Sequence, residues 1–223
     1  MTYHKPIGLK FYYGCMGSGK SENLIDTFQM VKAKAIVLQA TGSRGSDDLN
    51  ESREKDKLVA SRNGQSIPCT AIYVDMPSDD LLSLCMGHEW VLVDEAQFLT
   101  ALQVQTLKHI SLAACVQTYG LRSDFRGEWF SGSSALMLNA DNIIEIPRVC
   151  QVCKYNKATA HFRYTVKDGQ LLVDRAGAQV VHKTKASYVS CCSLCNDLYA
   201  SENEVGNLAK TAASLIEAFS DGT

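Results

Sequence analysis

The sequence predicts an α/β fold: a mostly parallel sheet with helices on both faces, plus a small C-terminal domain. Two observations carry this prediction. As far as Pro147, short apolar runs alternate with segments of helical periodicity, which is typical of strand–helix–strand units. After Pro147 the chain changes to paired cysteines and short β-type runs. We therefore expect domains at residues 1–147 and 148–200, with a helical tail at 201–223.

The first domain begins with the segment GCMGSGKS, which matches the phosphate-loop pattern G-x-x-x-x-G-K-[ST]. An apolar run at residues 9–13 precedes the loop and a helical pattern follows it, as this motif requires. Glycines let successive N–H groups face phosphate oxygens, so a P-loop, RecA-like sheet is predicted. The structural alternative is a glycine-rich turn that binds no ligand. The expected phosphate-binding residues are Gly14, Cys15, Met16, Gly17, Ser18, Gly19, Lys20 and Ser21.

Two side chains of this loop have separate expected roles. Lys20 would neutralise the β- and γ-phosphates of ATP, and the Ser21 hydroxyl would be a ligand of Mg²⁺.

The remaining elements of the first domain follow in order. Ser78 and Thr100 are expected to cap two helices, and a short helix is expected over residues 134–139. Strands are predicted at residues 35–38, 67–74, 90–93, 116–119 and 142–146.

A surface loop is predicted at residues 42–57, where glycine, serine and charges of both signs replace the apolar pattern. The cautious interpretation is a solvated connector. Loops after phosphate-binding elements often close over substrates, however, and Arg44 and Arg53 lie here. We include Arg44 among the expected ATP-binding residues.

Asp94 and Glu95 end the apolar run at residues 90–93, as expected where a buried parallel strand delivers acids to the carboxyl edge of its sheet. Asp94 fits a magnesium carboxylate. Glu95 would either activate a water, as in an ATPase, or accept a proton from a substrate hydroxyl, as in a kinase. The structural alternative is that Glu95 caps the next helix.

Cysteines form two CxxC pairs late in the chain, and such pairs favour tetrahedral zinc in a reducing compartment. Four thiolates leave no open coordination position, so the Zn²⁺ would be structural. Cys191 could replace Cys192 as the third ligand, and a redox role is the competing interpretation. The predicted zinc ligands are Cys150, Cys153, Cys192 and Cys195.

Composition bounds the function further. Hydrophobic residues make up 46% of the 223 residues and the formal net charge is −2, so no basic field favours general nucleic-acid binding. The polar N-terminus does not resemble a signal peptide, and no apolar run reaches about 18 residues. We expect a cytoplasmic protein without membrane or nucleic-acid partners.

With these features placed, the chain resembles the type II, zinc-ribbon thymidine kinases over residues 10–196. The resemblance rests on the phosphate loop with its methionine, the segment VDEAQF at residues 93–98, the segment YGLRSDFRG at residues 119–127, and the paired cysteines with Tyr188 before the second pair.

The resemblance implies phosphoryl transfer from ATP to the 5′-hydroxyl of thymidine, with Glu95 as the general base. It implies a lasso between the cysteine pairs, whose backbone near Val181 reads the base, and a homotetramer inhibited by thymidine triphosphate. The thymidine pocket is implied to contain Met16, Phe98, Leu121, Phe125, Phe130 and Tyr188, whose aromatic and thioether groups suit a flat, methylated base.

Two segments depart from the family pattern. Gly42-Ser43-Arg44 stands where Asp-Thr-Arg is usual, and HKTK at residues 182–185 stands where a Gly-Gly pair is usual. His161 aligns with a position that is commonly threonine.

Two other classes of function compete with a kinase. One is a P-loop ATPase whose zinc ribbon binds nucleic acid, against which the low basicity argues. The other is an inactive nucleotide sensor, against which the presence of Lys20, Ser21, Asp94 and Glu95 argues.

Overall fold

The computed structural model describes residues 7–42, 58–167, 170–174 and 187–201. These residues form two compact units, which we describe separately. The first contains residues 7–14, 19–42, 58–122 and 129–146. The second contains residues 15–18, 123–128 and the described residues from 147 onward. The predicted turn at residues 168–169 and the predicted tail helix after residue 201 lie outside the described residues.

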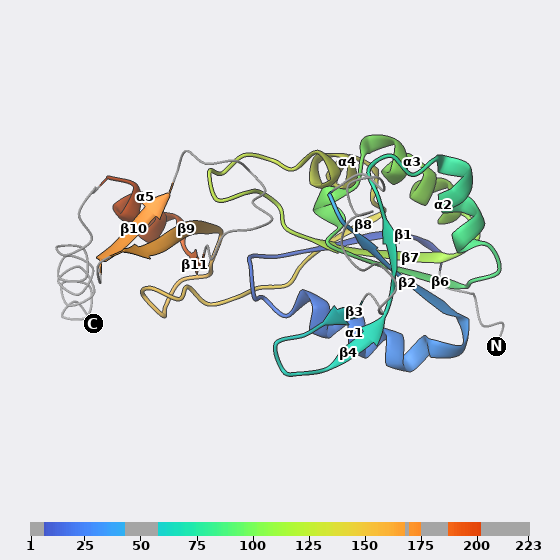
Figure 1. The fold of residues 1–223 in the computed structure, drawn as a ribbon, viewed down its shortest axis with the longest axis horizontal. Helices are drawn as coiled ribbons and strands as arrows, with labels where there is room; N and C mark the ends of the chain where they lie inside the picture. Colours follow the sequence, from blue (N-terminus) through green and yellow to red (C-terminus); the bar gives the residue numbers. More distant parts are fainter. Residues whose placement is uncertain (1–6, 43–57, 168–169, 175–186, 202–223) are drawn as a thin grey trace. The chain divides into compact units, whose positions relative to one another are not determined.

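The first unit is built on a six-stranded sheet in the order β5-β2-β6-β7-β1-β8, and each strand pair in it is parallel (Figure 1). This confirms the predicted α/β class. The strands are β1 (Gly8–Tyr13), β2 (Ala35–Ala40), β5 (Thr70–Ile72), β6 (Trp90–Asp94), β7 (Cys115–Gly120) and β8 (Asn142–Glu145).

Helices cover both faces of this sheet (Figure 1). One face carries α2 (Ser78–Cys85), α3 (Ala101–Ile110) and α4 (Ser131–Asn139), whose apolar side chains join the larger buried cluster. The other face carries α1 (Lys20–Val31), which packs with β3 (Leu58–Ala60) and β4 (Ser66–Pro68). Short 3-10 turns are η1 (Lys32–Lys34) and η3 (Ala96–Phe98). None of the helices within the described ranges is long and apolar enough to cross a membrane.

Local sequence signals give mixed results at the element ends. Thr100 caps α3 as predicted: its hydroxyl accepts from the Gln103 N–H at 3.2 Å, and the Gln103 side chain accepts from the Thr100 N–H at 3.0 Å. The predicted Ser78 cap is wrong, because Pro77 occupies the N-cap position and Ser78 is already helical. Proline suits this site because it has no N–H to leave unsatisfied.

The single strand predicted at residues 67–74 is also wrong. Its first part is β4, which pairs antiparallel with β3, whereas its second part is β5, which joins the main sheet in parallel with β2. Pro68 ends the first ladder because it cannot donate a further backbone hydrogen bond.

The second unit contains an antiparallel sheet in the order β10-β9-β11. Its strands are β9 (Ala160–Lys167), β10 (Gln170–Asp174) and β11 (Ser187–Cys191), and α5 (Ser193–Ser201) follows. Buried cysteines and Phe162 form its core. The β-type runs predicted at residues 160–166 and 171–173 are confirmed, whereas β3, β11 and α5 were not predicted. The domain boundaries expected from the sequence stay a prediction.

Candidate active site and metal centre

The phosphate loop starts where β1 ends. The Gly14 N–H donates to the Gly120 carbonyl at the end of β7, at 3.4 Å. Gly19 precedes α1 with φ of 89°, a left-handed conformation that glycine adopts without steric cost. The Lys20 ammonium donates to the Gly14 carbonyl at 3.2 Å. The first turn of α1 therefore places a cation and free helix N–H groups at the carboxyl edge of the sheet.

Ser21 and Asp94 lie side by side at this edge. The Ser21 hydroxyl donates to Asp94 Oδ2 at 3.2 Å, and Asp94 is 4% exposed as the last residue of β6. Burial raises the pKa of Asp94 to about 6; the Glu95 charge adds to this, while Ser21 and Lys20 oppose it. A hydroxyl beside a buried carboxylate fits the oxygen donor set that Mg²⁺ prefers.

Glu95 adopts a strained backbone conformation directly after β6. Its φ of 52° is left-handed, and among the described residues other than glycine only Lys154 shares a positive φ. Glu95 occupies the N-cap position of η3, as the structural alternative expects, but its side chain makes no capping hydrogen bond there. Instead, Glu95 Oε2 accepts from the Gln97 side chain at 2.5 Å.

Gln97 is a site residue that the sequence reasoning missed. Its Nε2 donates to Glu95, and its Oε1 accepts from the Leu121 N–H at 3.0 Å. A Cβ on Gly120 would lie 2.9 Å from the Gln97 backbone nitrogen, so β7 must end in glycine here. Gln97 lies within the VDEAQF segment, and a buried polar residue beside a strand-end acid was the available signal.

Aromatic residues of the first unit gather beside this turn. The rings of Phe98 and Phe130 meet edge to face, with centroids 5.7 Å apart. Phe98 also packs on Gly42, where a Cβ would approach its ring to 3.2 Å and where φ is 71°. Gly42, which departs from the family pattern, therefore leaves the space that the Phe98 ring occupies. Arg44, two residues further on, lies outside the described residues.

Phe125 belongs to the second unit and is held on one face by a cation. The ring is 2% exposed, and the Arg163 guanidinium of β9 lies 4.0 Å from its centroid. Arg163 is itself 3% exposed. No motif pointed to Arg163, because its contact joins segments that are distant in the sequence.

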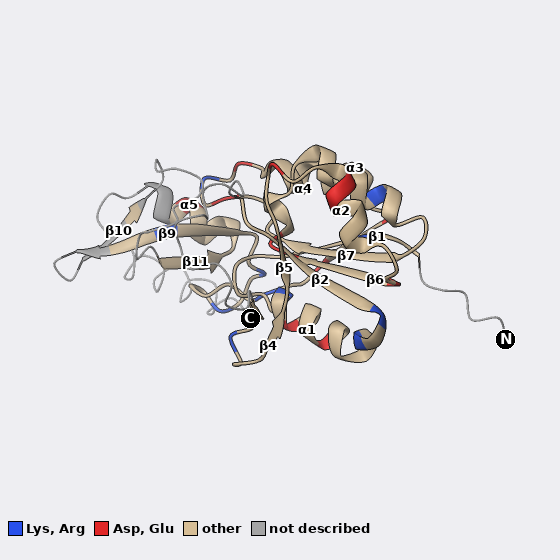
Figure 2. Ribbon diagram, turned by 45° about the vertical axis from the view of Figure 1, so that its right-hand side comes forward, with Lys and Arg blue, Asp and Glu red and all other residues tan. Residues whose placement is uncertain are grey.

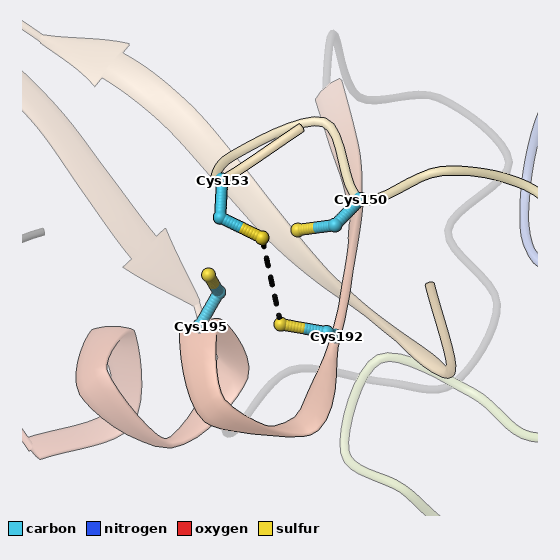
Figure 3. A group of neighbouring side chains, drawn as sticks. All are labelled: Cys150, Cys153, Cys192 and Cys195. Carbon is cyan, nitrogen blue, oxygen red and sulfur yellow. Dashed lines mark hydrogen bonds between the residues drawn. The ribbon is translucent and has the colours of Figure 1, made fainter. Parts of the chain in front are cut away.

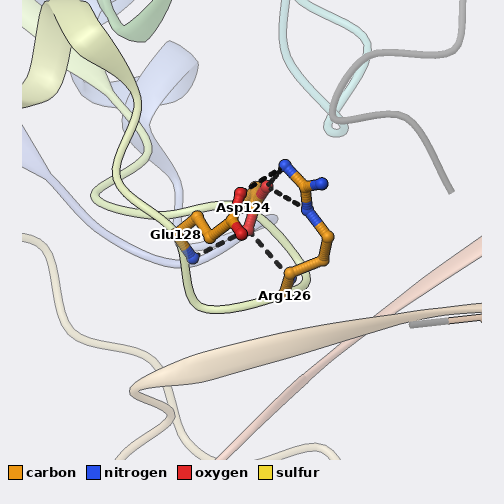
Figure 4. Close-up of polar contacts among 3 residues, drawn as sticks. All are labelled: Asp124, Arg126 and Glu128. Carbon is orange, nitrogen blue, oxygen red and sulfur yellow. Dashed lines mark hydrogen bonds and ion pairs between the residues drawn. The ribbon is translucent and has the colours of Figure 1, made fainter. Parts of the chain in front are cut away.

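Figure 4 shows how the turn that carries Phe125 is braced. Asp124 accepts hydrogen bonds from the N–H groups of Arg126 and Glu128 at 2.8 and 2.9 Å. The Arg126 guanidinium donates to Asp124 at 2.9 Å and pairs with Glu128 at 2.5 Å. The Asp-Phe-Arg part of the family segment therefore fixes the backbone that presents Phe125.

Tyr188 lies on β11 of the same unit, where its ring meets that of buried His161 edge to face, with centroids 6.1 Å apart. The backbone carbonyl of Met16 lies in this unit too, hydrogen-bonded to Ser190. Phe98, Leu121 and Phe130 belong to the first unit. Val181 and the implied lasso lie outside the described residues.

The four predicted cysteines come together in the second unit (Figure 3). The Sγ atoms of Cys150, Cys153, Cys192 and Cys195 all lie within 4.8 Å of one another. The Cys153 and Cys192 sulfurs are 3.9 Å apart, close to the edge of about 3.8 Å of a tetrahedron with zinc–sulfur bonds of about 2.3 Å. This cluster could hold one zinc ion. Cys191 points its sulfur toward Asn196 instead, at 3.9 Å.

The pKa values of two thiols in the cluster move in opposite directions: burial and the neighbouring sulfurs raise the pKa of Cys195, whereas the pKa of Cys153 is lowered. Although burial acts to raise it, the backbone N–H groups of Asn156 and Tyr155 and the neighbouring thiols lower it to about 7. At Cys153, amides aimed at the sulfur stabilise its ionised form.

Together, the parallel sheet, the phosphate loop and the paired carboxylates define a P-loop enzyme that handles nucleotide phosphates. Comparison with known proteins identifies the family: a thymidine kinase model matches residues 7–196. The thymidine kinase of Legionella pneumophila (strain Lens) is 34% identical over 195 residues, covering 83% of this chain and 87% of that protein. Those of Novosphingobium aromaticivorans and Shewanella oneidensis are each 35% identical, over 82% of this chain and 93% of theirs. The chain belongs to the thymidine kinase family.

The first prediction concerns the buried carboxylate. Ionised Asp94 costs stability in the metal-free protein, because its pKa of about 6 exceeds the unfolded value of about 3.9. Stability of the parent therefore falls as pH rises through this window. We expect Asp94→Asn to raise the free energy of unfolding at pH 7.5 by at most about 3 kcal/mol, a gain that shrinks toward pH 4.

Chemical denaturation of the metal-free protein over this pH series measures the effect. Asp26→Asn, which makes the same change at an exposed position of α1, is the matched control. A stability difference for Asp94→Asn that does not change with pH would contradict the prediction.

The second prediction concerns the metal. The parent should contain about one zinc per chain. Cys192→Ser should lose the metal and unfold the second unit, because one ligand of a closed tetrahedron is removed. Cys191→Ser should keep it, since that sulfur contacts Asn196. Elemental analysis and circular dichroism give the measurements. Metal lost from Cys191→Ser and kept by Cys192→Ser would transfer the ligand role to Cys191.

Proposed function

We propose that this member of the thymidine kinase family transfers the γ-phosphoryl group of ATP to the 5′-hydroxyl of thymidine, giving thymidine monophosphate. The observation that carries the proposal is the end of β6, where Asp94 meets Ser21 of the phosphate loop and Glu95 follows in a strained conformation. A magnesium carboxylate next to a general base at the loop is the arrangement that phosphoryl transfer needs.

The phosphate loop, residues 14–21, provides the triphosphate site in this proposal. Its N–H groups and the Lys20 ammonium would receive the phosphate oxygens, and Lys20 would exchange its Gly14 contact for them. The Ser18 hydroxyl is buried and, within the described part of the chain, is one of two buried side-chain polar atoms without a hydrogen-bond partner. An orphaned donor in a phosphate loop is satisfied when an anion binds. Arg44 is proposed as a further phosphate ligand.

Magnesium, held by Ser21 and Asp94, would neutralise charge on the β- and γ-phosphates. Glu95 would take the proton from the 5′-hydroxyl. Its orientation comes from Gln97, which donates to one carboxylate oxygen while the Leu121 N–H holds Gln97 in turn. A carboxylate with one oxygen bonded keeps the other available for the substrate proton.

The base site is proposed from the family segments. Phe125, Phe98 and Phe130 are aromatic, and an aromatic wall suits a flat base. Phe125 is backed by Arg163, which fixes the plane of its ring. Met16, Leu121 and Tyr188 are proposed to complete the pocket, and the backbone near Val181 to read the polar edge of the base.

Further properties of the family enter as proposals. They are a homotetramer, inhibition by thymidine triphosphate, a structural zinc and a cytoplasmic location. Absence of a nucleic-acid partner is supported by the formal net charge of −2; charged residues of both signs lie on the first unit, with Asp79 and Asp80 in the first turn of α2 and Lys32 and Lys34 after α1 (Figure 2). A P-loop ATPase that binds nucleic acid would need a basic surface.

Release of ADP should accordingly depend on added thymidine and not on added DNA or RNA.

The third prediction tests the general base. Glu95→Gln should lower kcat by about 10²–10⁴-fold, because the amide cannot accept the proton of the hydroxyl. The KM values of ATP and thymidine should change little, since the loop and the pocket are intact. Glu89→Gln, which makes the same change at a glutamate paired with Lys34 before β6, should keep the parent rate. Thymidine turnover by Glu95→Gln at the parent rate would refute the assignment.

The fourth prediction tests the base pocket. Phe125→Ala should raise the KM of thymidine on the order of ten- to a hundredfold, by analogy with about 1–3 kcal/mol per base–aromatic stack. The KM of ATP should move far less. Tyr155→Ala removes an exposed aromatic residue of the same unit and serves as the control. Equal increases in both KM values would show that Phe125 supports the fold and not the base.

A further inference from the structure

Two side chains of the second unit donate hydrogen bonds to the tip of the phosphate loop, residues 15–18, which belongs to the same unit. Arg148 Nη1 donates to the Met16 carbonyl at 2.9 Å and also to the Gly17 carbonyl. The Ser190 hydroxyl donates to the same Met16 carbonyl at 2.7 Å. Two consecutive carbonyls of the loop are thus occupied, one of them twice.

Both donors sit on a rigid support. Ser190 is fully buried on β11, and its backbone and the Gln151 backbone and side chain exchange hydrogen bonds at 2.8 and 2.9 Å. The Arg148 carbonyl accepts from the Ala158 N–H at 2.7 Å. The Ala158 carbonyl in turn accepts from the Cys15 thiol at 3.3 Å, so a third contact reaches the loop tip.

The contacts matter because a peptide group is planar and trans. Its C=O and N–H point in opposite directions, so fixing the carbonyls of Met16 and Gly17 fixes the N–H groups of Gly17 and Ser18. The Ser18 N–H already donates to the Cys15 carbonyl at 3.2 Å and closes the turn. The Gly17 N–H is directed away from Arg148, toward the opposite side of the loop.

The same contacts also keep the loop carbonyls from turning toward a bound phosphate. A loop of glycines can rotate its peptide planes, and Gly17 has φ of 69°. A rotated plane would present a carbonyl oxygen to a phosphate oxygen, and two negative atoms repel each other. A guanidinium bonded to both carbonyls opposes that rotation, since charge-assisted hydrogen bonds are about twice as strong as neutral ones.

We propose that Arg148 and Ser190 are positioning residues that hold the phosphate loop in its nucleotide-binding conformation, with their effect expressed in ATP affinity. The inference rests on the proposed function of the loop. Arg148 lies two residues before Cys150, and Ser190 lies two residues before Cys192. The two chain segments that carry the cysteine cluster therefore also carry the two side chains that donate hydrogen bonds to the Met16 carbonyl.

The test compares Arg148→Ala, Arg148→Lys and Ser190→Ala with the parent, using the full chain with its zinc. Binding of ATP with Mg²⁺ is measured by titration calorimetry in the absence of thymidine. We expect Arg148→Ala to weaken ATP binding about tenfold and Ser190→Ala to weaken it less, because Arg148 still holds the Met16 carbonyl. Arg148→Lys should fall between Arg148→Ala and the parent, since an ammonium can hold one carbonyl. Arg62→Ala, on an exposed turn, is the charge-matched control.

Two readouts separate positioning from a general loss of structure. Free guanidinium should restore part of the ATP affinity of Arg148→Ala and leave the parent unchanged. In steady-state assays of Arg148→Ala, the KM of ATP should rise about tenfold while the KM of thymidine stays within twofold. The variant should keep the zinc content and the Tm of the parent.

Unchanged ATP affinity in Arg148→Ala overturns the inference, as does a parallel loss of ATP and thymidine affinity without guanidinium rescue. If Arg148→Ala does not fold, the Arg148→Lys and Ser190→Ala affinities decide the question in the same way. A parent that binds ATP but does not phosphorylate thymidine would refute the proposed function alone, because the binding test uses no thymidine.

Discussion

The parallel direction of the six strands is the constraint from which the candidate active site follows. In a parallel sheet the carboxyl ends of all strands meet at one edge, so Tyr13, Asp94 and Gly120 end their strands together. This is why Ser21, at the start of α1, reaches Asp94 across many residues of sequence. It is also why Gln97, in the turn after β6, contacts the end of β7. Because Gly120 has no side chain, the end of β7 can lie directly against the backbone of Gln97.

The cysteine-bearing unit contributes more than a stable appendage. Its strand β9 supplies Arg163 to the ring of Phe125, and the segment before β9 supplies Arg148 to the phosphate-loop tip. In both places a guanidinium restrains a short loop that carries a residue proposed to meet substrate. A closed four-cysteine site has no open position for chemistry. A metal there would act by keeping the supports of Arg148 and Ser190 in place.

The sequence predicts well whatever depends on neighbouring residues. Hydrophobic periodicity located most strands of the main sheet, and the CxxC spacing located the sulfur cluster, because each pattern is local. It failed at residues 67–74, where one apolar run serves two sheets, and tertiary pairing divides it at Pro68. Arg148 could not be assigned at all, since its contact to Met16 spans 132 residues and no motif encodes it. Gln97 was visible in a motif, but its role depends on where β7 ends.

Unfavourable local features, such as a positive φ at a non-glycine residue or a buried polar group, gather near the proposed active site. Within the described chain, the two non-glycine residues with positive φ are Glu95, after Asp94, the proposed magnesium ligand, and Lys154, which turns the first cysteine pair. Asp94 is a buried carboxyl with a raised pKa, and Ser18 leaves a buried hydroxyl unpaired. Each of these features destabilises the ligand-free protein. Under the proposed function, a cation beside Asp94 and an anion beside Ser18 would supply the missing partners and offset part of that cost.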